Sequence, residues 1–241
     1  MKAFLYTLYL KTKLDLKSMD ILITNYLVPL LFFGVMGAVF TSIMPESRTT
    51  LIPSMVIFSV TMGSLIGIPG SIMEYSQNDL RKSFKSAGIP MDAIVASSFI
   101  SGFLNLSVVS CIIYFVSPLA FKSVVPENIW LFITGFSVFL TATLLLGILL
   151  GLYAKNSSKL TMYAQLIFLP SMMLSGIMFP ADMLPKILEY AGYLLPATHG
   201  MNLLSSQALE TNHFLVLSMS AIVLLVLIKL RLNRLKREDA R

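Results

Sequence analysis

Six long apolar stretches constrain the fold of this 241-residue chain more than any other feature of its sequence. A helix needs roughly 18 or more mostly apolar residues to cross the hydrocarbon core of a bilayer. The stretches that approach or exceed this length are Tyr26–Met44, Leu51–Met73, Ala93–Leu119, Ile129–Tyr153, Leu160–Ile177 and Phe214–Leu230. The sequence therefore predicts an all-α membrane protein with six transmembrane helices, in which residues 1–241 form a single transmembrane domain.

The distribution of positive charge predicts the orientation of this domain. If the N-terminus lies in the cytoplasm, all but three of the 18 Lys and Arg residues fall on the cytoplasmic side, and the exceptions are Arg48, Lys122 and Lys186. This bias follows the positive-inside rule and places both termini in the cytoplasm. We interpret the basic residues as contacts for anionic membrane lipid, and we expect no nucleic-acid partner.

Residues 1–20 have the pattern of an amphipathic helix that lies along the inner leaflet and leads into the first span. The alternative is a frayed cytoplasmic leader. On the helix, one side carries most of the apolar residues, and Lys11, Lys13, Asp15 and Lys17 cluster in the polar part. We therefore expect these four charges to face solvent or lipid headgroups.

The cores of the six stretches contain no Asp, Glu, Lys, Arg or His, although Lys229 stands at the end of the last one. Ionisable residues inside a membrane usually mark a proton or ion path, so the sequence disfavours a self-contained secondary transporter or channel. A membrane-embedded enzyme or assembly factor is a third alternative, but the chain shows no catalytic constellation. It also has no G-x-x-x-x-G-K-[ST] phosphate loop, so we predict no catalytic residues, no ATPase site and no bound cofactor.

The most polar internal segment, residues 74–92, lies between the second and third predicted spans. Ser76 and Asp79 have the spacing of a weak capping box, and Leu80 and Phe84 follow at helical spacing. Gly88 and Pro90 are stop signals, so we predict a helix of about three turns near the membrane surface. It either rests on lipid headgroups or inserts into a groove on a cytoplasmic partner.

This segment resembles the corresponding loop in the membrane subunit, or permease, of type-2 ATP-binding-cassette exporters. In that family the loop between spans two and three forms a coupling helix that docks on the ATPase. The resemblance implies an ATPase-coupling role for Glu74, Asp79, Leu80, Arg81, Phe84, Lys85, Gly88 and Pro90. The chain has Asn78-Asp79 where a Gly-Thr pair is usual in the family.

A second, more specific resemblance covers Leu174 to Leu204. The family pattern of Ser-Gly, Phe-Pro, Leu-Pro and Leu-Pro-x-Thr is matched by residues that include Ser175, Gly176, Phe179, Pro180, Pro185, Pro196 and Thr198. In the family this region forms two short helices that re-enter the outer leaflet before the last span. The resemblance implies that residues 178–200 form a re-entrant outer gate, and the alternative is an ordinary packed surface loop.

The resemblance also implies the partners and the mechanism. It implies a subunit of the bacterial cytoplasmic (inner) membrane that pairs with a second permease copy, as a homodimer or heterodimer. Each copy binds a cytoplasmic ATP-binding-cassette ATPase, which holds ATP-Mg. The uncharged spans favour an amphiphilic cargo such as a drug, lipid, peptide or glycan-lipid.

Three smaller features complete the sequence-based expectations. His199 and His213 lie 14 residues apart, without the spacing of a metal-binding helix, so we predict no metal site. Cys111 is the only cysteine and is expected to be a small buried side chain. Two small-residue motifs, Gly63-x-x-x-Gly67 and Gly147-x-x-x-Gly151, are expected to allow close helix packing within the domain, the alternative being a subunit interface.

Overall fold

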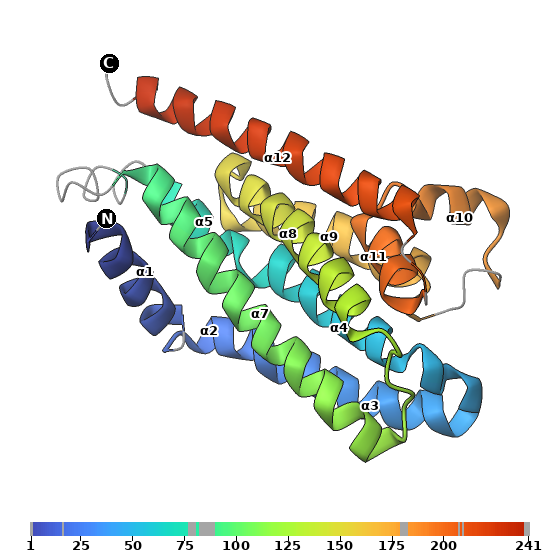
Figure 1. Ribbon diagram of the computed structural model, residues 1–241. Helices are drawn as coiled ribbons and strands as arrows, with labels where there is room; N and C mark the ends of the chain where they lie inside the picture. Colours follow the sequence, from blue (N-terminus) through green and yellow to red (C-terminus); the bar gives the residue numbers. More distant parts are fainter. Residues whose placement is uncertain are drawn as a thin grey trace.

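The computed structural model describes residues 2–15, 17–76, 81, 90–178, 183–206, 208 and 210–238. Within these residues every regular element is a helix. In chain order they are α1 (Lys2–Asp15), α2 (Met19–Leu22), η1 (Ile23–Leu27), α3 (Val28–Ile43), η2 (Pro45–Thr49), α4 (Leu51–Met62), η3 (Gly63–Gly67), α5 (Pro69–Ser76), α7 (Met91–Phe121), α8 (Ile129–Tyr153), α9 (Ser157–Leu174), α10 (Lys186–Gly192), α11 (Pro196–Ser205) and α12 (Thr211–Glu238). The long helices pack side by side as one bundle (Figure 1).

Five of the helices in the described part of the chain are long and apolar enough to cross a membrane. They are Met19–Ile43, Leu51–Ser76, Met91–Phe121, Ile129–Tyr153 and Thr211–Arg237. The chain is thus an all-helical membrane protein, as predicted, and five of the predicted spans coincide with these helices. The first span starts at Met19 rather than Tyr26, because α2, η1 and α3 join end to end. The other predicted span, Leu160–Ile177, coincides with α9, which is shorter and more polar and is not among the five.

The two ends of the bundle hold different elements (Figure 1). Helix α1, the end of α5, the start of α7 and the last turns of α12 lie at one end, which we call the α1 end. Helices α10 and α11 lie at the opposite end, which we call the α11 end. Helix α9 starts near the finish of α8 and runs toward the α11 end.

Helix α8 is central to the packing and contacts α12, α5, α11 and η3. Its two motif glycines make these contacts close. A Cβ atom added at Gly147 would lie 1.8 Å from the backbone oxygen of Ser64, and one added at Gly151 would lie 2.6 Å from that of Pro69. Gly63 and Gly67 in turn face side chains of Leu106 and Asn25. Both motifs therefore serve internal packing, as predicted.

The second span forms the interior of the bundle. Its most apolar window is 83% buried, whereas the corresponding windows of the first and last spans are each 17% buried. A spanning helix that is buried on all sides needs no polar face, because every backbone group is bonded within the helix. The largest fully buried side chains come mainly from this span and from α7 and α8, and include Leu51, Ile52, Met55, Ile57, Leu65, Ile72, Leu106, Ile113, Phe139, Leu140, Leu144 and Ile148.

The ends of the central helices are fixed by side-chain caps and by one strained turn. Asn128 accepts a hydrogen bond from the backbone of Leu131 at the start of α8, and Asn156 does the same for Lys159 at the start of α9. Such caps satisfy the free N–H groups of a first helical turn. Helix α7 ends at Phe121, and the residue that follows it, Lys122, adopts a left-handed conformation with φ 52°.

The prediction for Cys111 is wrong, since this side chain is exposed on the surface of α7. Its position on the helix points outward from the bundle, and in a membrane an outward-facing apolar side chain lies in lipid rather than in water. Burial within the protein is therefore not required to keep a thiol away from solvent here.

Candidate functional sites

The predicted coupling segment is framed by α5 and α7 at the α1 end. Glu74 is exposed in the last turns of α5 and Pro90 is the exposed residue that precedes α7, while Arg81 is buried. Ser76 is the last residue of α5, and its hydroxyl donates to the carbonyl of Met73. The remaining predicted coupling residues, Asp79, Leu80, Phe84, Lys85 and Gly88, lie outside the described residues.

A buried ion pair joins α1 to these flanking helices. The Nζ of Lys11 lies 2.7 Å from Oδ1 of Asp15, and the two residues are only 7% and 6% exposed. Lys11 also donates to the hydroxyl of Ser71 on α5 at 3.3 Å and lies over the ring of Tyr75, 5.2 Å from its centre. The second oxygen of Asp15 accepts a 2.6 Å hydrogen bond from Ser101 on α7.

This arrangement corrects the prediction that Lys11, Lys13, Asp15 and Lys17 all face outward. Lys13 and Lys17 are exposed as predicted, but Lys11 and Asp15 are buried. The reason is geometric: residues four apart share one helix face, and that face packs against α7 and α5 instead of water. The sequence did contain a signal for this burial. Ser98, Ser101 and Asn105 form a polar stripe at helical spacing on α7, and such a stripe needs a polar partner in a membrane.

The polar network continues from the ion pair toward the middle of the bundle. Asn105 donates to the hydroxyl of Ser101 at 3.5 Å and accepts a 2.9 Å hydrogen bond from Tyr26 on the first span. Beside it lies Asn25, which is 1% exposed and whose side-chain atoms have no hydrogen-bond partner within the protein. Asn25 faces Gly67, where a Cβ atom would come within 2.2 Å of its Oδ1.

Asn25 and Gly67 belong to two π-helical segments, η1 and η3, which contact each other. A π-helical turn has one extra residue relative to an α-helical turn and is often found at functional sites. The first two spans therefore both depart from regular α-helix at the level where the polar network ends.

At the α11 end, the predicted gate residues that the structure describes lie at the ends of α9, α10 and α11. Ser175 follows the last residue of α9, and its hydroxyl donates to the carbonyl of Ser171. Gly176 then turns the chain with φ 84°. Thr198 on α11 donates to the carbonyl of Gly192 on α10 at 2.7 Å. Pro185 immediately precedes α10 and Pro196 is the first residue of α11. Phe179 and Pro180 lie outside the described residues.

A hydrogen-bonded chain of side chains joins this region to the last span. Nε2 of His199 lies 2.8 Å from the carbonyl oxygen of Tyr193, and its Nδ1 lies 2.7 Å from Nδ1 of His213 on α12. Nε2 of His213 lies 3.0 Å from Oε2 of Glu210. The two histidines lie 14 residues apart in the sequence, and only the packing of α11 against α12 brings their rings together.

The acceptors at the two ends of this chain determine where its protons lie. The carbonyl of Tyr193 only accepts, so Nε2 of His199 carries a hydrogen and, in the neutral ring, Nδ1 is an acceptor. Nδ1 of His213 then donates to this acceptor, and Nε2 of the same ring faces the carboxylate of Glu210. Burial lowers the pKa of His199, the hydrogen bond to Tyr193 opposes this change, and the neighbouring His213 lowers the pKa further.

These histidines do not form a metal centre. Glu210 lies on the far side of the His213 ring from His199, so the three groups do not converge. No group of three or more His, Cys, Asp or Glu residues within the described part of the chain is arranged to hold a metal ion.

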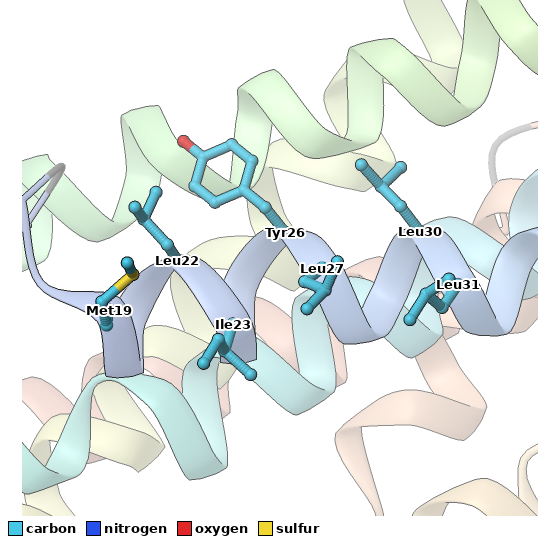
Figure 2. A pocket seen from close by; sticks show the side chains of 7 residues that line it. All are labelled: Met19, Leu22, Ile23, Tyr26, Leu27, Leu30 and Leu31. Carbon is cyan, nitrogen blue, oxygen red and sulfur yellow. The ribbon is translucent and has the colours of Figure 1, made fainter.

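The first span has an apolar depression on its surface with a volume of about 470 Å³ (Figure 2). Leu22, Tyr26 and Leu30 point toward α7 in this view. The exposed residues at four-residue spacing, Met19, Ile23, Leu27 and Leu31, point away from the bundle. Apart from the hydroxyl of Tyr26, which donates to Asn105, the residues that line the depression are apolar, so this face is suited to contact with lipid or with another apolar helix.

The comparison with known families decides the identity of the fold. The family model described as ABC-2 type transporter matches residues 5–209, which includes every site described above except those at the start of α12. The chain belongs to the ABC-2 type transporter family.

Two curated relatives of this ABC-2 protein are described as "Probable multidrug ABC transporter permease YbhS", from Escherichia coli strain K12 and from Escherichia coli O157:H7. Each is 33% identical over 90 residues, which is 37% of this chain and 24% of the relative. The match thus spans about a quarter of the relatives' length. No solved structure matches the chain.

Membership in the ABC-2 family indicates that the chain is a transmembrane subunit of an ABC transporter. Members of this family are membrane subunits that lack the ATPase site, and they work with an ATP-binding-cassette partner protein.

Proposed function

We propose that this chain is the transmembrane subunit of an ATP-driven exporter that forms the translocation pathway as a dimer and is coupled to a separate cytoplasmic ATPase. The observation that carries the proposal is the family match over residues 5–209. The family supplies the transport function. The proposal is also supported by the described helices that flank the predicted coupling segment, since the end of α5 and the start of α7 lie at the same end of the bundle as α1.

The order of the helices supports a six-span topology. Helix α8 finishes toward the α1 end and α12 returns to that end from the α11 end (Figure 1). The chain must therefore cross once between them, and α9 is the helix that does so. Its 18 residues span about 27 Å, close to the roughly 30 Å of a bilayer core.

Charge supports a cytoplasmic position for the α1 end. Arg48, Lys122 and Lys186 belong to η2, the end of α7 and the start of α10, whereas the last turns of α12 carry a basic cluster. This is the asymmetry that the positive-inside rule describes for a protein of the bacterial inner membrane.

In this exporter the described residues of the two predicted sites have separate roles. Glu74, Arg81 and Pro90, with the rest of the coupling segment, contact the ATPase that holds ATP-Mg. Ser175, Gly176, Pro185, Pro196 and Thr198 hold the re-entrant hairpin that forms the outer gate.

The surface and interior of the bundle support a dimer and an amphiphilic cargo. The first and last spans expose most of their apolar surface, which is available to a second permease copy and to lipid. Interior polar groups of the spans are uncharged serine, threonine and asparagine side chains. Such a lining suits a drug, lipid, peptide or glycan-lipid, and a multidrug permease is the description given to the relatives.

The proposal is tested by affinity purification of the tagged chain from its native host in mild detergent. We expect an ATP-binding-cassette ATPase to copurify with the wild type and to be lost with Phe84→Asp, which places a charge on the predicted apolar docking face. Gln77→Asp introduces the same charge at a polar position of the same segment and should retain the ATPase. Folding of all three proteins is checked by size-exclusion chromatography.

The alternative, a self-contained secondary transporter or channel, predicts a different outcome. The folded wild-type protein would then purify without an ATPase, and neither aspartate variant would change its composition. That result would contradict the exporter assignment.

A further inference from the structure

We propose that Lys11 and Asp15 form a latch that positions α1 against the two helices flanking the coupling segment, and that release of this latch is a step in ATPase coupling. The inference rests on the proposed exporter function. It makes Lys11 and Asp15 positioning residues, which act through α5 and α7 rather than by contacting ATP or cargo.

The contacts of the ion pair bridge both sides of the coupling segment. On one side, Lys11 meets Ser71 and the ring of Tyr75, both of which lie in α5, the helix that ends at Ser76. On the other side, Asp15 meets Ser101 of α7. A force applied to the coupling segment must move α5 or α7, so it acts directly on this pair.

The pair is fully satisfied only while α1 is docked. One oxygen of Asp15 is held by Lys11 and the other by Ser101, and buried charges require such complete pairing. If α5 and α7 separate, Ser71 and Ser101 leave the pair and its two charges lose part of their compensation. Both charges then regain stabilisation by reaching water, which is available to a helix at the membrane surface. This competition gives α1 two states, docked and released.

The interior beside the latch is suited to rearrangement. Neither amide atom of Asn25 has a partner within the protein, and the hydroxyl of Ser98 also lacks one. Both residues line the same small cavity as Lys11 and Asp15. Unsatisfied buried polar groups destabilise this packing relative to another arrangement of the helices that pairs them. Asn25 also belongs to the π-helical segment η1 of the first span.

A purely structural role does not require charges at these positions. Apolar side chains of similar size pack as well or better in place of a buried ion pair, whereas removal of only one partner is strongly destabilising. A latch that must open therefore differs from a permanent contact in a testable way. An apolar replacement should hold α1 docked and yet impair the coupled cycle.

The experiment uses the complete permease–ATPase complex in vesicles of phosphatidylethanolamine and phosphatidylglycerol. It compares four forms with the wild type: Asp15→Asn, the apolar double variant Lys11→Met with Asp15→Leu, the exchanged pair Lys11→Asp with Asp15→Lys, and Lys13→Met. The last variant removes an exposed charge of the same helix and serves as the matched control. Amide hydrogen exchange of residues 2–15 reports docking, and the ATP hydrolysis rate per complex reports coupling.

We expect Asp15→Asn to increase exchange in α1 about tenfold, because it leaves Lys11 as an unpaired buried charge. The apolar double variant should keep α1 at least as protected as the wild type and lower the ATP hydrolysis rate several-fold. The exchanged pair should restore most of that rate, and Lys13→Met should change neither quantity.

The latch is overturned if the apolar double variant keeps α1 protected and hydrolyses ATP at the wild-type rate, since the pair is then only a packing contact. It is equally overturned if Asp15→Asn leaves the exchange of α1 unchanged. Failure of the exporter proposal looks different, because in that case no ATPase copurifies with the wild-type chain.

Discussion

Substitution of Gly147 by alanine tests the central packing contact of the bundle. The added Cβ atom would lie 1.8 Å from the carbonyl oxygen of Ser64, whereas real Cβ contacts are essentially never under 3.0 Å. Helix α8 and the segment η3 must therefore separate by at least about 1.2 Å. Because the obstructing atom is backbone and cannot rotate away, we place the cost near the upper end of the usual range for overpacking, about 3 kcal/mol.

Alanine also favours helix over glycine by about 1 kcal/mol, so the net loss is about 2 kcal/mol. For a domain of this size that loss lowers the unfolding temperature by about 4–8 °C. Gly34→Ala is the matched control, since its Cβ atom meets nothing within 4 Å and only the gain in helix propensity remains. Thermal unfolding of both variants in the same detergent measures the difference. An unfolding temperature for Gly147→Ala equal to or above that of Gly34→Ala would refute the packing argument.

Three further predictions concern the α11 end and the outer surface of the bundle. The folded protein lowers the pKa of His199 below its ordinary value of 6.5, so the neutral ring contributes stability that is present above pH 6.5 and is lost as the pH falls through the lowered pKa. The unfolding temperature should therefore drop over this pH range. A variant with His199→Gln and His213→Gln should lose that part of the pH dependence. Thr198→Val removes the hydroxyl that donates to Gly192 and should cost about 1 kcal/mol, which urea or thermal unfolding measures; unchanged stability would show that this bond is not needed to hold α10 and α11 together. Cys111 is exposed and should react with a membrane-soluble maleimide but slowly with a charged one, and equal rates with both reagents would contradict its placement facing lipid.

Helix formation and the main spans could be predicted from the sequence because both depend on local properties. In a membrane, an apolar stretch of sufficient length must satisfy its own backbone hydrogen bonds, and a helix does so without help from any neighbour. Ile129–Tyr153 was predicted with the bounds that the structure shows. The fifth predicted span is not among the five apolar helices for the same reason, since Gln165 and the polar start of α9 lower its mean hydropathy.

The first span shows where local reasoning fails. The predicted stretch begins at Tyr26, directly after Thr24 and Asn25, but the helical segment continues back to Met19. Asn25 is tolerated inside the helix because Gly67 of the neighbouring span leaves room for its amide. That compensation depends on a residue more than forty positions away, so no local pattern contains it.

By itself, the sequence determined which segments are helical, that most of them are long and apolar enough to cross a membrane, and which side chains share a helix face. Lys11 and Asp15 share a face because they lie four residues apart. Only the tertiary structure decided that this face is buried against α5 and α7, while Lys13 on the same helix stays exposed. It likewise placed His199 beside His213 by folding α11 back onto α12. The physical reason is that burial is a property of the surfaces that meet, and which surfaces meet depends on the packing of all the helices together.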